Sequence, residues 1–403
     1  MTHPIEPTDA INHKDSLSHR ALPQLPSRQT DHKSDTSPFQ VPTPILPLTL
    51  QHYLEGYNDN SAKTLVSGFQ NGFSLGSIGS LTPSIYRNHS SVSEHQAFVK
   101  NKIISDIKLG RVKGPYLQPP FSNFVSSPLG VVPKKSANSF RIIHDLSFPK
   151  NSQSVNSTIP YENSTVTLET FDDVANLVLS AGKNCLIAKA DIEEAFKIIP
   201  ISPLDYHKLG FSFNNCFYFQ TVLPMGASSS VQIFESFSKA LQWILQNKFQ
   251  VRRVSHIVDD FIFVGPANTN TCQAALDTFL NLASDLGVPI KNDKTIQPST
   301  CVEVHGILLD TCTLMAKLPQ DKLDHLKLLV SKFMYCKKVS LQKLQSILGH
   351  LNFACKVIKP GRCFLRRLYN ATKGHSNPSH LVKLTKECRA DLKRMTLGCS
   401  KSQ

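Results

Sequence analysis

The chain has 403 residues and a mass of 44.8 kDa, with 40% hydrophobic and 18% charged residues. This length allows two or three domains with a large buried core. It contains no apolar run of the roughly eighteen residues needed to cross a bilayer, so we expect no membrane partner. The N-terminus resembles neither a secretory signal nor a transit peptide, which predicts an intracellular protein. Ten cysteines without a C-x-x-C pair argue against a zinc site or a disulfide scaffold.

The net charge of +14 is concentrated near the C-terminus. Residues 316–403 contain 19 Lys and Arg against 4 Asp and Glu, whereas residues 1–315 are nearly neutral. Neutralising phosphates with Lys and Arg releases condensed counterions and gives affinity that does not depend on base sequence. The segment therefore predicts either a surface that binds nucleic acid or a merely well-solvated helical surface.

The first 150 residues divide into three segments with different predicted structures. Residues 1–47 contain eight prolines among polar residues, which predicts a disordered leader. Residues 48–113 predict a helical extension, with one helix over Val92–Leu109 that ends at Gly110. Two strand-like runs, Ser127–Lys135 and Ser139–Ser147, then predict a basic hairpin.

The central part predicts alternating strands and helices. Residues 184–201 form a buried strand that carries Asp191 at its end, and two further strands turn at Asn214 and Asn215. Three serines, 228–230, precede an apolar stripe at helical spacing, which predicts a capped amphipathic helix.

A second strand and helix pattern follows this helix. Ser255–Gly265 is an apolar segment with two acids, Cys272–Gly287 is helical and Val302–Asp310 reads as one strand, before basic helices beyond Ala316. The order predicts an α+β domain in which helices pack on one face of an antiparallel sheet.

Asp259 and Asp260 are the most informative pair of residues. An Asp-Asp pair is usually a surface turn, but this one interrupts a run of apolar residues on both sides. Two adjacent carboxylates on a half-buried hairpin are costly unless cations compensate them. If the sheet sets the strand of Asp191 beside this hairpin, three acids converge and can hold two divalent cations for phosphoryl transfer.

The ordered motifs of the chain resemble those of a reverse transcriptase. The motifs are SPLGVVPKK, FRIIHDLS, ADIEEAF, LPMGASSS, IVDD, LGVPIKNDKT and VEVHGILLD. Longer segments resemble the polymerase of DIRS-type retrotransposons, which integrate through a tyrosine recombinase. These segments are GPYLQPPFSNFVSSPLGVVPKK, SFPKNSQSVN, IIPISPLDYHKLGF and LPMGASSSVQIFESFSKALQWI. The resemblance extends from about Gln51 to about Lys393.

The resemblance implies a right-hand polymerase fold with fingers, a palm and a helical thumb. The implied boundaries are a leader at 1–47, a helical extension at 48–113, fingers and palm at 114–315, a basic thumb at 316–395 and a tail at 396–403. It also implies an RNA-directed DNA polymerase that uses two Mg²⁺ or Mn²⁺ ions, dNTPs and an RNA or DNA template-primer. A ribonuclease H domain, which normally follows such polymerases, is not expected here.

The resemblance assigns a role to each matching residue. Asp191, Asp259 and Asp260 would be catalytic metal ligands, and Lys294 would protonate the departing pyrophosphate. Nucleotide binding would involve Lys134 and Arg141 as a triphosphate clamp, Phe196 as a sugar gate, and Pro224, Met225 and Gly226 as pocket lining. Nucleic-acid binding would involve Val304, His305 and Gly306 as a primer grip, and Lys359, Arg362, Arg366 and Arg367 as a phosphate stripe.

Each residue also has an ordinary structural interpretation. Phe196 could be a core aromatic, Lys134 and Arg141 a solvated hairpin face, and Lys294 a loop lysine. Two other functions compete with a polymerase: a degenerate remnant that only binds nucleic acid, and a two-metal nuclease. A nuclease would have no need for a sugar gate or a triphosphate clamp.

Overall fold

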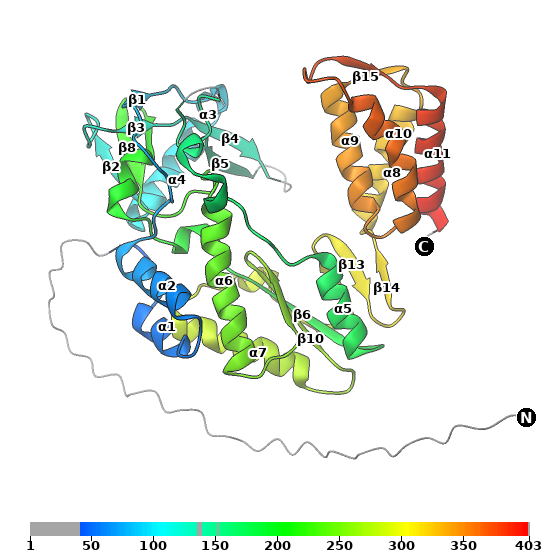
Figure 1. The fold of residues 1–403 in the computed structure, drawn as a ribbon, viewed down its shortest axis with the longest axis horizontal. Helices are drawn as coiled ribbons and strands as arrows, with labels where there is room; N and C mark the ends of the chain where they lie inside the picture. The colour runs from blue at the N-terminus through cyan, green and yellow to red at the C-terminus, as the bar shows by residue number, and fades with distance from the viewer. Residues whose placement is uncertain (1–40, 135–138, 151–152, 402–403) are drawn as a thin grey trace, which may run out of the picture. The chain divides into compact units, whose positions relative to one another are not determined.

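The computed structural model describes residues 41–134, 139–150 and 153–401. The predicted leader lies almost entirely outside the described residues. The remainder is mixed helix and sheet (Figure 1). Among the described helices, none is long and apolar enough to span a membrane.

The central sheet has four antiparallel strands in the order β11-β6-β10-β9. Its strands are β6 (Leu186–Asp191), β9 (Val254–Ile257), β10 (Asp260–Gly265) and β11 (Ile296–Ser299). The apolar runs around the predicted acids therefore form the two middle strands, β6 and β10. This confirms the predicted antiparallel sheet.

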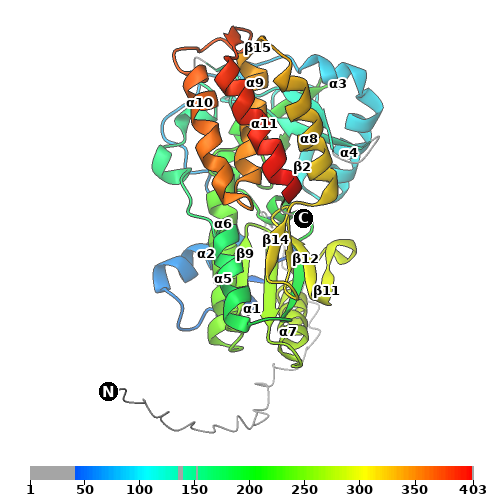
Figure 2. The same ribbon diagram turned by 90° about the vertical axis from the view of Figure 1, so that its right-hand side faces the viewer.

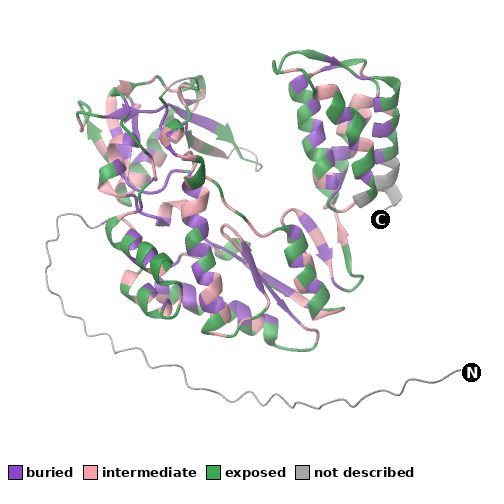
Figure 3. Cartoon of the chain, in the orientation of Figure 1, coloured by how far each residue is buried: buried purple, intermediate pink, exposed green. Residues whose placement is uncertain are grey.

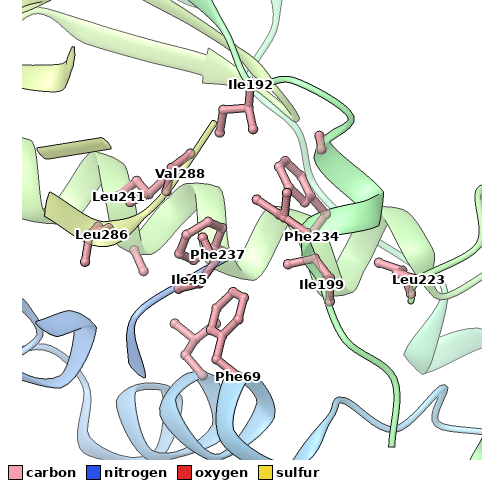
Figure 4. Packing of buried hydrophobic residues seen from close by; sticks show 14 of the residues in the cluster. Ile45, Phe69, Ile192, Ile199, Leu223, Phe234, Phe237, Leu241, Leu286 and Val288 are labelled. Carbon is pink, nitrogen blue, oxygen red and sulfur yellow. The ribbon is translucent and has the colours of Figure 1, made fainter. Parts of the chain in front are cut away.

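Both faces of this sheet are covered, because alternate residues of β6 and β10 point to opposite sides. On one face, Ala188, Ala190, Phe261 and Phe263 pack in the largest apolar core with α6 (Ser230–Asn247) and α7 (Thr271–Leu286). Figure 4 shows Phe234, Phe237 and Leu241 of α6 in this core. On the other, residues such as Ile262 pack with α5 (Phe171–Ala181). The prediction that helices cover one face only is wrong, because both strands are apolar on both sides.

The N-terminal extension contributes to the same core. Its first two helices are α1 (Pro47–Tyr53) and α2 (Asp59–Asn71), from which Leu50, Leu65 and Phe69 are buried in the core. The backbone amide of Leu46 donates to the carbonyl of Leu286, 2.9 Å away, at the end of α7. This segment is thus part of the central fold.

A second sheet has five strands in the order β1-β3-β7-β8-β2, and β4 and β5 form a separate hairpin. The turn of the β7-β8 hairpin is at Asn214 and Asn215, whose φ angles are 49° and 58°, as predicted from the Asn-Asn pair. The predicted basic hairpin is also confirmed, with Val132 opposite Arg141. The strands are β1 (Ser84–Ile85), β2 (Val112–Tyr116), β3 (Val125–Ser126), β4 (Leu129–Pro133), β5 (Phe140–His144), β7 (Gly210–Phe213) and β8 (Cys216–Gln220).

Three predicted elements differ in detail. The helix expected over 92–109 is two helices, α3 (Ser90–Glu94) and α4 (Gln96–Lys108), because His95 leaves the helical conformation with φ −126°. The serine before α6 does not cap it, since the hydroxyl of Ser229 is buried and makes no cap hydrogen bond. The segment 302–310 is a hairpin, in which β12 (Cys301–Val304) turns back as β13 (Ile307–Asp310), because Gly306 permits a left-handed turn at φ 79°.

The helices of the basic C-terminal segment lie side by side (Figure 2) and enclose an apolar core of their own. Figure 3 shows that each of these helices has buried residues. The helices are α8 (Gln320–Met334), α9 (Leu341–Ala354), α10 (Arg362–Thr372) and α11 (Lys386–Lys401). Three short strands complete this part of the chain: β14 (Met315–Lys317), which pairs with β13, and the pair β15 (Lys338–Ser340) and β16 (Leu381–Lys383). The prediction of helices is confirmed, and the strands were not predicted.

Candidate active site

The three predicted acids lie at one end of the central sheet. Asp260 begins β10 directly opposite Asp191, the last residue of β6. Asp259 occupies the turn between β9 and β10, and its carbonyl accepts a hydrogen bond from the amide of Ile192, 3.1 Å away. The antiparallel register thus brings together acids that are nearly seventy positions apart in the sequence.

Two lysines contact these carboxylates. The ammonium of Lys294 donates to Oδ2 of Asp191 at 2.7 Å, and Lys189 Nζ lies 2.9 Å from Oδ2 of Asp260. The second oxygen of Asp260, Oδ1, is buried and has no hydrogen-bond partner among the described residues. A buried oxygen without a donor is costly, so the site retains capacity for a cation.

The environment disfavours negative charge on the acids. Burial and, secondarily, the nearby Asp191 raise the pKa of Asp259 to about 6. Burial also raises the pKa of Asp191, an effect that its hydrogen bond from Lys294 opposes and the neighbouring Asp260 reinforces. The hydrogen bond with Asp191 raises the pKa of Lys294, so this lysine keeps its proton.

The donor set fits a hard divalent cation, because it consists of carboxylate oxygens and one of them is buried without a partner. In the described part of the chain, no three His, Cys, Asp or Glu side chains are arranged so that they could already hold a metal ion. Lys294 and Lys189 contact oxygens that a metal would need. These two lysines therefore have to yield their positions when a cation binds.

Replacing Asp259 by Asn should stabilise the protein without metal. A carboxyl whose pKa is about 6 when folded, above its usual 3.8, weakens the folded state as pH rises from about 4 through 6. We expect the Asn variant to melt a few degrees higher than the wild type at pH 7.5 in EDTA, and at the same temperature at pH 4.

Asp293→Asn is the matched control, since Asp293 lies nearby with its side chain 76% exposed and should show no such gain. Equal melting temperatures of wild type and Asp259→Asn at pH 7.5 would contradict the burial of the Asp259 charge.

A pocket of about 310 Å³ adjoins Asp260 and the predicted primer grip. Its lining includes Lys189, Lys294 and the turn residues His305 and Gly306. Neither ring nitrogen of His305 has a hydrogen-bond partner in the described structure, and burial, with help from Lys189, lowers its pKa to about 4. His305 is therefore neutral beside the acids. Val304, by contrast, is fully buried and faces the core.

Phe196 lies in a short 3₁₀ helix, Ala195–Ile198, a few residues after Asp191. Its ring is half-buried, with its centroid 5.5 Å from that of Phe234 in α6. The preceding Glu194 has a left-handed backbone, φ 46°, and its carboxylate pairs with Lys102 and Arg111. One side of the Phe196 ring thus belongs to the core, and the ring is not enclosed by it.

The segment Pro224–Gly226 lies against the C-terminal end of β5, at His144. Met225 is 60% exposed, and Pro224 is buried. A side chain at Gly226 would meet the carbonyl oxygen of His144 at 2.0 Å, so only glycine fits here. The amide nitrogen of Asn156 donates to the carbonyl of Gly226 at 2.8 Å, which fixes the segment from outside the motif.

The predicted triphosphate clamp is exposed. Lys134 and Arg141 lie on the β4-β5 hairpin, and neither makes an ion pair within the described ranges 41–134, 139–150 and 153–401. Both charges are thus available to a ligand.

The predicted phosphate stripe is divided by the structure. Arg362 and Arg366 are exposed on α10. Arg367 instead makes two hydrogen bonds, 3.1 and 3.0 Å long, to the carboxylate of Asp391, which is 3% exposed. Lys359 begins a short 3₁₀ helix, and its side chain lies outside the described part. Arg367 therefore has an internal partner that its two neighbours lack.

Two residues that contact members of the candidate site escaped prediction. Lys189 stands inside the apolar LIAKA strand, and a lysine in such a run was itself a signal that a buried acid lay opposite. The role of Asn156 could not be predicted from the sequence, because asparagine is common in polar loops. Its contact with Gly226 exists only in the folded chain.

Comparison with protein families confirms what this geometry indicates. The family model described as Reverse transcriptase (RNA-dependent DNA polymerase) matches residues 132–309, which include all three acids and Lys294. Residues 132–309 are thus similar to a reverse transcriptase domain. The predicted enzyme class, a nucleotidyltransferase, is thereby confirmed for this domain.

The reverse transcriptase domain has viral relatives. Protein P of duck hepatitis B virus (strain China) is 26% identical over 213 residues, which cover 52% of this chain and 26% of the relative. The Gag-Pro-Pol polyprotein of human T-cell leukemia virus 3 (strain 2026ND) is 26% identical over 221 residues, covering 52% of this chain and 14% of the polyprotein. The chain thus matches about a quarter or less of the length of these relatives.

Solved structures resemble a larger part of the chain. The foamy viral protease-reverse transcriptase in complex with double-stranded DNA covers 91% of this chain, which in turn covers 62% of that structure, with a TM-score of 0.60 and 17% identity. The same protein with an RNA/DNA hybrid has a TM-score of 0.60 and 18% identity, covering 88% of this chain and 46% of that one. The predicted right-hand polymerase fold, with helices and sheets around the reverse transcriptase domain, is confirmed.

Proposed function

We propose that the chain is an RNA-directed DNA polymerase that adds deoxynucleotides to a primer 3′ end. The observation that carries this proposal is the register of the central sheet, which sets Asp191 against Asp260 with Asp259 at the adjoining turn. We further propose a retrotransposon of the DIRS type as the origin of the chain. The longer motifs support this, in particular the segment from Leu223 to Ile244.

Asp191, Asp259 and Asp260 would hold two divalent cations, Mg²⁺ or Mn²⁺. Such ions, when bound, stabilise the attacking and leaving oxygens of a phosphoryl displacement. The unpartnered Oδ1 of Asp260 supports this role. Because Lys294 is held protonated beside Asp191, it is suited to give its proton to the departing pyrophosphate once it leaves that carboxylate.

The remaining residues would bind and select the nucleotide. Lys134 and Arg141 carry exposed positive charge for the triphosphate, the arginine through its bidentate fork. Phe196 would lie against the sugar and exclude a 2′-hydroxyl. Met225 and Gly226 would line the base-pair pocket, with Asn156 holding Gly226 in place.

Template and primer would be bound by the primer-grip turn and by the basic helices α8–α11. In the described side chains of residues 316–403, only Lys317, Lys322, Arg367 and Arg394 pair with a carboxylate. Most of the positive charge there is therefore uncompensated, which supports a phosphate-binding surface.

Primer extension by the purified chain tests this function. A labelled primer annealed to RNA or to DNA of one sequence should be extended with dNTPs and Mg²⁺ or Mn²⁺ on both templates. Binding of the primer-template without extension, under any of these conditions, would instead identify a remnant that only binds nucleic acid.

Replacing Arg362 and Arg366 together by Gln should weaken binding of all duplex sequences about equally. Phosphate contacts carry no base information, and each one lost should reduce the logarithmic salt slope by about 0.9. Fluorescence anisotropy between low and physiological salt measures this slope.

Arg367→Gln is the matched control on the same helix. It should lower the melting temperature, because Asp391 would remain buried without its main partner, and leave the salt slope nearly unchanged. If Arg367→Gln reduces the slope while the double variant does not, the binding stripe lies on a different face of α10.

A further inference from the structure

A polar stripe interrupts the apolar face of α6, the helix that packs on β9. Glu235, Ser238 and Gln242 are spaced by three and four residues and therefore share one side of the helix. Glu235 is 1% exposed and Ser238 is 0% exposed. A carboxylate removed from water in this way requires a specific partner.

The partner of Glu235 is His256 of β9, which is 2% exposed. Its Nε2 lies 3.2 Å from Oε1 of Glu235, and its Nδ1 contacts Oε1 of Gln242. The network continues from Gln242, whose amide nitrogen donates to Oε1 of Glu169 at 2.8 Å. The hydroxyl of Ser255 donates to the other oxygen of Glu169.

These contacts constrain which nitrogen of the His256 ring donates. A carboxylate only accepts, so Gln242 has to present its nitrogen to Glu169 and its oxygen to His256. Nδ1 of His256 must then donate, and Nε2 faces the carboxylate of Glu235. A second proton, on Nε2, would let the ring donate to this carboxylate as an imidazolium. Lys239, 3.9 Å from Glu235 and 49% exposed, is the other cation at this carboxylate.

The same helix face holds the turn that carries the catalytic acids. The hydroxyl of Ser238 donates to the carbonyl of Val258 at 2.6 Å. Val258 has φ 57°, a left-handed conformation that a β-branched residue adopts only under constraint. His256 stacks on Phe261, with ring centroids 5.3 Å apart and planes at 19°. Contacts from α6 thus reach His256 and Val258, before Asp259, and His256 in turn packs on Phe261, after Asp260.

We propose that Glu235 and His256 form a buried ion pair that fixes the Val258–Asp259 turn, so that both act as positioning residues for nucleotide addition. The catalytic role of the turn rests on the proposed function, whereas the ion pair and its hold on the turn do not. Neither side chain touches the reacting atoms. Their effect is to keep the carboxylates of Asp259 and Asp260 where the register of the sheet presents them.

Variants that neutralise one or both partners test the positioning role. Glu235→Gln and His256→Gln should each lower kcat about 100-fold, because small displacements at a reacting centre have effects of that size, with little change in KM for dNTP. The double variant Glu235→Gln/His256→Gln replaces the pair by two amides. Its kcat should be at least about tenfold higher than that of the less active single variant.

Lys239→Gln is the matched control, since it removes the outer contact to the same carboxylate and should leave kcat unchanged. Unchanged kcat in the two single variants, together with a lowered melting temperature, would show that the pair is only structural and would overturn the proposal.

A spectroscopic measurement tests whether the ion pair forms, and it does not depend on polymerase activity. Protein labelled with ¹⁵N-histidine is measured at pH 7, and the His256 signal is identified by its absence from the His256→Gln variant. In the wild type this ring should show two protonated nitrogens. In Glu235→Gln the same ring should be neutral. Amide hydrogen exchange over residues 257–261 should be faster in both single variants. A neutral ring in the wild type, or unchanged exchange in the variants, would overturn the proposal even if the wild type extends no primer.

Discussion

Replacing Asp259 or Asp191 by Asn is expected to abolish nucleotide addition while the fold remains intact. Each substitution removes one negative charge from a set of three that would hold two dications. The two remaining carboxylates cannot compensate the charge of two dications. The loss of transition-state stabilisation should be at least about 4 kcal/mol, or about a thousandfold in rate.

Single-turnover primer extension measures this effect, and a melting curve shows that the variants are folded. Asp293→Asn, an exposed acid of the same pocket, should extend normally. Extension by Asp259→Asn at near the wild-type rate would refute the assignment of the active site.

Replacing Phe196 by Ala should admit ribonucleotides. If its ring occupies the volume that a 2′-hydroxyl needs, truncation removes the clash, and incorporation of ribonucleotides relative to deoxynucleotides should rise by one or more orders of magnitude. The variant should also lose some stability, because one side of the ring packs near Phe234.

Phe237→Leu separates these two effects. Phe237 is fully buried in the same core, with its ring centroid 6.3 Å from that of Phe234. This variant should lower the melting temperature and leave the sugar preference unchanged. If Phe196→Ala behaves in the same way, Phe196 is only a core aromatic.

The sequence identified the central elements because their signals are local. Apolar residues on both sides of Asp259 and Asp260 predicted strands, and the structure places Asp260 opposite Asp191 as that interpretation required. The pair Asn214 and Asn215 predicted a tight turn because both residues tolerate positive φ. In each case a few neighbouring residues suffice to determine the conformation.

Features that depend on distant contacts were missed. The prediction of one strand over 302–310 overlooked the turn signal of Gly306, since the apolar residues around it read as continuous. Glu235 reads as an ordinary polar residue of an amphipathic helix until the fold sets His256 against it, 21 positions away. No periodicity in the sequence encodes such a pairing, because it depends on how α6 packs on β9.

The early segment of the chain determines how small an autonomous fragment can be. The family match begins at residue 132, yet Ile45, Leu50 and Phe69 lie in the same core as Phe237 of α6 (Figure 4). The amide of Phe73 also donates to the carbonyl of Pro200, 2.9 Å away. Expression of residues 132–309 alone would leave an apolar face of α6 and α7 open to water, and such a face drives aggregation. Soluble fragments of this chain should therefore begin at or before Val41.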